Sequence, residues 1–111
     1  WRAKGWFHFT RDELPAAQEA YETALKLNPY DWKSRHQFAA VLRRLGEQDR
    51  LEQITDLALE GKNLERTLFE LPSASDLPPE IRARLIAYAK QVGDHEFATA
   101  AERHFAVGPA L

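Results

Sequence analysis

Histidine and carboxylate side chains are the groups in this sequence that could catalyse a reaction or hold a metal ion. His95 and His104 fall in one predicted helix but are nine residues apart, which is neither of the one-turn spacings that suit a shared metal ion. The carboxylates gather in three clusters: Asp12-Glu13, Glu47/Asp49 and Asp94/Glu96. All three clusters lie at predicted helix starts, where carboxylates cap backbone amides and complement the helix dipole. We therefore predict that the chain is not an enzyme and needs no metal ion or cofactor.

The amino-acid composition narrows the remaining classes of function. The chain has 111 residues, of which 44% are hydrophobic and 29% charged, and its net charge is −2. This is an ordinary globular mixture without the basic excess typical of nucleic-acid or membrane-surface binding. There is no cysteine, which excludes disulfides and thiol chemistry, and the apolar runs are far shorter than the roughly 20 residues that span a bilayer. The compartment is left unassigned, with the cytoplasm favoured.

The elements that position these side chains are predicted to be helices. Apolar residues recur at spacings of three and four between strong helix breakers, and no alternating strand pattern is present. We expect helices near 1–10, 13–27, 32–45, 47–60, 78–92 and 94–106, with Asp12, Asp31 and Asp76 as capping residues. Residues 62–77 are expected to be an insertion that forms either an extra helix over 62–71 or a loop.

A spacing of 34 residues relates the first two pairs of helices. Ala17 and Leu51, Ala24 and Ala58, and the motifs at Asp12 and Gly46 are all 34 residues apart. A helix-turn-helix unit of this period is typical of tetratricopeptide arrays. Gly93 restarts the pattern 47 residues after Gly46, which is one period plus an insertion of 13.

The chain resembles the tetratricopeptide repeat family. The first repeat carries the signature most clearly: Trp1, Gly5, His8, Ala17, Tyr21, Ala24, Leu25 and Pro29. The resemblance implies a single all-α domain over 1–111, with repeat-like units at 1–31, 32–63 and 78–110. It implies a right-handed superhelical solenoid of about three helical hairpins. Because the sequence begins at Trp1 within a helical pattern and contains no methionine, we expect it to be part of a longer chain.

In each predicted hairpin the first helix is basic and the second helix is acidic. Predicted helix 32–45 carries Lys33, Arg35, Arg43 and Arg44 without any acid, whereas helix 47–60 has five acids against Arg50. In the family, first helices line the concave groove. Projection onto that geometry places eight residues in or beside the groove: Arg2, Trp6, Phe9, Lys33, His36, Arg43, Arg44 and Lys90.

Cations flanked by aromatic rings suit an acidic peptide or a terminal carboxylate. The predicted function is therefore binding of a protein or peptide, and we expect neither nucleic acid nor membrane as a partner. Attraction between oppositely charged paired helices is the alternative origin of the charge pattern. Two other roles stay open: a spacer or self-association module whose contact surface is Trp1, Trp6 and Phe7, and a recruiting segment of a larger enzyme.

Overall fold

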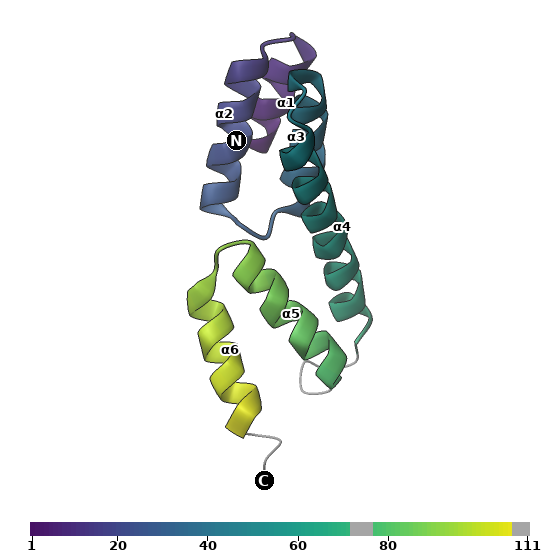
Figure 1. Cartoon of the computed structure of the whole chain (residues 1–111), viewed down its shortest axis with the longest axis vertical. Helices are drawn as coiled ribbons and strands as arrows, with labels where there is room; N and C mark the ends of the chain where they lie inside the picture. The colour runs from purple at the N-terminus through teal and green to yellow at the C-terminus, as the bar shows by residue number, and fades with distance from the viewer. Residues whose placement is uncertain (72–76, 108–111) are drawn as a thin grey trace. The chain divides into compact units, whose positions relative to one another are not determined.

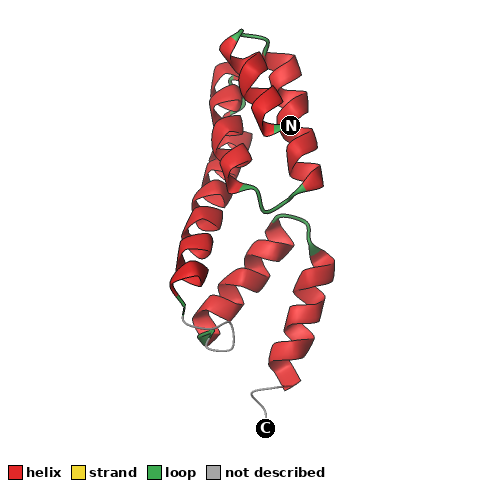
Figure 2. Ribbon diagram, turned by 180° about the vertical axis from the view of Figure 1, so that it is seen from behind, coloured by secondary structure: helices red, strands yellow, loops and turns green. Residues whose placement is uncertain are grey.

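The chain is all-α, as the sequence predicts. The computed structural model describes residues 1–71 and 77–107, and these residues form helices and connecting loops without any strand (Figure 2). In chain order the helices are α1 (Arg2–Thr10), α2 (Leu14–Leu27), α3 (Trp32–Leu45), α4 (Gln48–Glu70), α5 (Pro79–Gln91) and α6 (His95–Val107), labelled in Figure 1. The predicted capping residue Asp76 lies outside the described residues.

Two compact units divide the chain. The first unit, Trp1–Lys62, contains α1, α2, α3 and the first part of α4. The second unit, Asn63–Leu111, contains the end of α4 together with α5 and α6. In the second unit α5 and α6 pack through small side chains, because Ala89, Ala98 and Ala101 are buried there beside Tyr88.

Helix α4 corrects the predicted helix boundary. The sequence predicts a break at Gly61, but α4 runs without interruption from Gln48 to Glu70. A glycine inside a helix costs only about 1 kcal/mol relative to alanine, so burial on one face offsets it. Gly61 is buried, and it continues a buried stripe that runs from Ala58 to Leu64. Residues 62–70 are therefore helical and continuous with α4.

The core of the first unit depends on a close approach between α1 and α2. Tyr21 is fully buried and its ring stacks on Phe38 of α3, with the ring centroids 5.8 Å apart. A Cβ added at Gly5 would lie 2.7 Å from Cζ of Tyr21, so only glycine leaves room for this ring. Leu51 and Ile54 extend the same core from α3 to α4.

The same turn follows α1, α3 and α5. In each turn one residue adopts a left-handed conformation: Asp12 (φ 61°), Gly46 (φ 77°) and Gly93 (φ 91°). The amide of the next residue then donates to a carbonyl five residues earlier, as from Glu47 to Leu42. This hydrogen bond, with the shorter one beside it, defines a Schellman motif. The three turns are spaced by 34 and 47 residues, so the spacing in the sequence corresponds to one repeated local structure.

The helix starts confirm one predicted cap and correct another. Asp31 accepts a hydrogen bond from the Ser34 amide at 3.1 Å, as a capping residue at the start of α3 should. The prediction that Asp12 caps α2 is wrong, because Glu13 occupies the position before the helix and Asp12 forms the left-handed turn. An aspartate tolerates this conformation better than most residues, which allows it to stand where the other turns have glycine.

This turn gives a paired stability prediction. In an Arg44→Gln background, which removes the ion pair of Asp12 with Arg44, Asp12→Gly should raise the free energy of unfolding by about 0.5 kcal/mol, because glycine adopts the left-handed conformation without strain. Gly46→Ala should lower it by about 1 kcal/mol, because the added Cβ is strained there whatever space surrounds it. Urea denaturation followed by circular dichroism measures both changes. Asp12→Ala in the same Arg44→Gln background is the control and should be less stable than Asp12→Gly; a loss of stability on Asp12→Gly in that background would contradict the account.

Candidate functional site

Most of the predicted binding residues lie on α1 and α3 of the first unit. Arg2 and Trp6 on α1 are exposed and Phe9 is half-buried. On α3 the exposed side chains are Lys33, His36, Arg43 and Arg44. These two helices contact each other, so both contribute to one part of the first unit. Lys90 is also exposed, on α5 of the second unit.

The end of α1 brings together three of the predicted residues. The rings of Trp6 and Phe9 are tilted against each other with centroids 5.7 Å apart. The Arg44 guanidinium lies 5.9 Å from the Phe9 ring centroid and also forms an ion pair with Asp12. Trp6, Phe9 and Arg44 together offer an exposed indole beside a guanidinium that already has a carboxylate partner.

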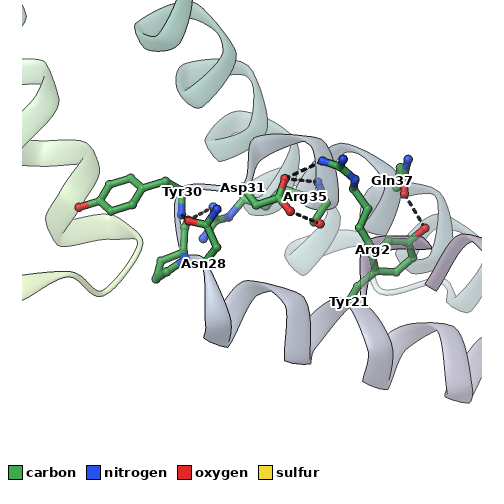
Figure 3. A network of polar contacts seen from close by, with 9 residues as sticks. Arg2, Tyr21, Asn28, Tyr30, Asp31, Arg35 and Gln37 are labelled. Atoms are coloured by element: carbon green, nitrogen blue, oxygen red, sulfur yellow. Dashed lines mark hydrogen bonds and ion pairs between the residues drawn. The ribbon is translucent and has the colours of Figure 1, made fainter. Parts of the chain in front are cut away.

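Arg2 belongs to a polar network at the start of α3 (Figure 3). Its Nη1 donates to Asp31 Oδ1 at 3.2 Å, and the same carboxylate accepts from the Ser34 hydroxyl at 2.6 Å. Burial works to raise the pKa of Asp31, but the Ser34 hydrogen bonds and the Arg2 charge outweigh it and hold that pKa below its usual value. Arg2 therefore stabilises the junction between α2 and α3.

A second part of this network fixes Tyr21. Its hydroxyl donates to Gln37 Oε1 at 2.9 Å, which links α2 to α3 (Figure 3). Burial raises the pKa of Tyr21 to about 12, an effect that the nearby Arg2 charge partly opposes. The phenol therefore stays protonated and remains a donor throughout the neutral range. Arg35 is likewise structural, because it is buried and donates to the Pro29 carbonyl.

Lys90 pairs with an acid of its own unit. Its Nζ contacts Oε1 of Glu102 on α6, and both side chains are about half-exposed. This pair joins the two helices of one hairpin, as the alternative origin of the charge pattern expects. Arg2–Asp31 and Arg44–Asp12 instead join a first helix to a loop residue. Three of the eight predicted residues are thus engaged in ion pairs within the molecule.

A pocket between α3 and α4 was not predicted from the sequence. Its volume is ≈ 300 Å³ and its lining is mainly apolar. The lining residues are Trp32, His36 and Ala39 from α3, and Thr55, Ala58, Leu59 and Lys62 from α4. We call it the α3–α4 pocket. Helical spacing on the two helices could have revealed it, but the predicted helix end at residue 60 left Lys62 outside the helix.

Two cations lie beside the Trp32 ring of this pocket. Lys33 Nζ is 5.7 Å and Lys62 Nζ is 6.0 Å from the ring centroid, distances that allow a cation–π interaction. Among the predicted residues, only His36 also lines the pocket. The pocket therefore combines apolar walls with a Lys62 ammonium group and a His36 imidazole, a combination suited to an apolar group that carries a carboxylate.

The histidine and acidic side chains considered for catalysis or metal binding form no cluster in the described residues. In the described residues, no three histidine or acidic side chains come together in a way that could hold a metal ion. His8 is largely buried, with its Nδ1 3.5 Å from Glu13 Oε1, while His95 and His104 are exposed. None of the helices described is both long enough and apolar enough to cross a membrane.

The Asp31 network predicts a pH-dependent contribution to stability. Because folding lowers the pKa of Asp31, its ionised form stabilises the protein above the unfolded pKa of about 4, and this contribution disappears as the pH falls through the lower folded value. Asp31→Ala should reduce the free energy of unfolding at pH 7 by about 1 kcal/mol, through loss of the cap.

Asp31→Asn is the matched variant, because asparagine still caps a helix but carries no charge. The difference in unfolding free energy between wild type and Asp31→Asn should narrow as the pH is lowered from 6 toward 2. Urea denaturation at several pH values measures it. A difference that stays constant over this range would show that the Asp31 charge does not stabilise the fold.

Comparison of the chain with protein-family models, curated proteins and solved structures found no match.

Proposed function

We propose that this chain is a protein-interaction module that binds an acidic peptide segment of a partner protein. We further propose that its hairpins stack as a right-handed solenoid of the tetratricopeptide type. The repeated Schellman turn after α1, α3 and α5 supports the hairpin assignment, since it recurs at the same place in each pair of helices. Arrays of this kind use their surfaces to bind extended partners.

The observation that carries the proposal is the α3–α4 pocket with its basic edge. Its apolar walls would bury part of a ligand, and Lys62 and His36 would orient a carboxylate beside them. In the part of the chain that the structure describes, no carboxylate forms an ion pair with Lys62 or Arg43. These cations are therefore available to a ligand without first giving up an internal partner.

The predicted binding residues that carry positive charge fall into two groups, according to whether they already form an ion pair with a carboxylate. Arg2, Arg44 and Lys90 already have carboxylate partners, so an acidic ligand would have to compete with them. Lys33, His36 and Arg43 are exposed on one helix and, with Lys62, form the set that we expect to contact the ligand. Electrostatic attraction by such a set falls as salt screens it.

Titration of the isotope-labelled protein with an acidic peptide tests this function. Lys62→Gln combined with Arg43→Gln should weaken binding about tenfold at low salt, and raising the salt should weaken binding to the wild type. Lys26→Gln is the control, because it removes one exposed charge from α2 of the same unit. Equal binding of acidic and basic peptides, or no binding of acidic peptides, would overturn the proposal.

Self-association is a second candidate, and a different observation favours it. Trp1, Trp6 and Phe7 are 52%, 48% and 53% exposed, an unusual concentration of large apolar surface at one helix. If this surface joins two copies, the mass measured by sedimentation should rise with concentration, and Trp6→Ser should restore the monomer. A constant monomer mass up to high concentration would exclude this role.

A further inference from the structure

The α3–α4 pocket is lined by residues whose sequence positions correspond to Gly5 and Tyr21 of the first hairpin. Its α4 residues Thr55, Ala58 and Leu59 are each 34 residues beyond a residue of α2, and Thr55 corresponds in this way to Tyr21. On α3, Ala39 corresponds to Gly5. At corresponding sequence positions the first two hairpins therefore differ: the first has a buried tyrosine ring, and the second has an open pocket.

In the first hairpin that position is completely filled. Tyr21 is fully buried, its ring lies directly over Gly5, and its hydroxyl donates to Gln37 at 2.9 Å. Thr55 is much smaller and is exposed at the pocket. The volume of ≈ 300 Å³ is at the lower end of the range for ligand sites, which suits one ring-bearing side chain better than a large ligand.

We infer that the α3–α4 pocket binds a single aromatic side chain of an acidic peptide, in the place that Tyr21 fills in the first hairpin. The ring would pack against Ala39 and Ala58, and a carboxylate next to it in the peptide would face Lys62. Charge complementarity selects this occupant, because the pocket joins apolar walls to a cation without an acidic partner among the described residues. The inference rests on the proposed function and specifies which peptides it applies to.

Four five-residue peptides test the acidic-peptide function and the aromatic pocket separately. They combine either glutamate or glycine flanks with either tyrosine or alanine at the centre, and their ends are acetylated and amidated. The acidic function predicts tighter binding with glutamate flanks. The pocket predicts about tenfold tighter binding with a central tyrosine, together with amide shifts at Ala39 and Ala58. Tyrosine and alanine peptides that bind equally would overturn the pocket, even if the acidic function holds; a tyrosine effect without a glutamate effect would overturn the acidic function alone.

Two variants of Thr55 test the location. Thr55→Tyr should fill the pocket from within and abolish the preference for tyrosine, so that the acidic tyrosine and alanine peptides bind this variant equally. Thr55→Val keeps the volume of the side chain and should retain the preference. A preference that persists in folded Thr55→Tyr would place the ring elsewhere, and so would wild-type shifts confined to other helices. Concentration-dependent mass that only Thr55→Tyr abolishes would identify a second copy as the occupant and overturn the peptide assignment.

Discussion

The architecture of the first unit depends on the contact between Gly5 and Tyr21. A glycine in the middle of α1 has a cost in helix stability, but it lets the tyrosine ring of α2 lie directly against the backbone of α1. The same ring stacks on Phe38, and its hydroxyl binds Gln37, so one side chain fixes three helices in a single arrangement. A larger residue at position 5 would separate α1 from α2 and displace the ring from α3. The polar and charged contacts at the surface act on an arrangement that this packing has already set.

Local chemistry explains which elements could be predicted from the sequence. Gly46 and Gly93 mark real helix ends because a left-handed residue closes each Schellman turn, and Asp31 marks a real helix start because its carboxylate caps the Ser34 amide. Gly61 has the same residue type but belongs to the buried face of α4, within a helix that continues to Glu70. Asp12 shows the reverse ambiguity, since an aspartate before a helix fits either a cap or a left-handed turn. In both cases tertiary packing decides, and a pattern in the chain does not contain that information.

The exposed cations of the candidate site could be predicted from the sequence, but their ion pairs could not. Charge and residue type place Lys33, His36 and Arg43 on the exposed surface of α3, and this holds in the structure. Whether a given cation is paired depends on which acid the fold brings near it, so the Arg44–Asp12 pair between residues 32 positions apart was not expected. The α3–α4 pocket was missed for a different reason: the helix end predicted at residue 60 left Lys62 outside the helix, so the lining residues of α4 were not seen as one face.

The two explanations of the charge pattern are complementary. Exposed ion pairs such as Arg44–Asp12 typically contribute less than about 1 kcal/mol each, so they are a weak reason to concentrate so many cations on α1 and α3. Each pair nevertheless neutralises one cation and so limits where the positive potential of the first unit remains. Five exposed cations of the first unit have no carboxylate partner among the described residues: Lys4, Lys26, Lys33, Arg43 and Lys62. Two of them, Lys33 and Lys62, flank the Trp32 ring of the pocket. Of these unpaired cations, Lys33 and Lys62 lie beside the apolar walls of the α3–α4 pocket, which is why the proposal places the acidic ligand there.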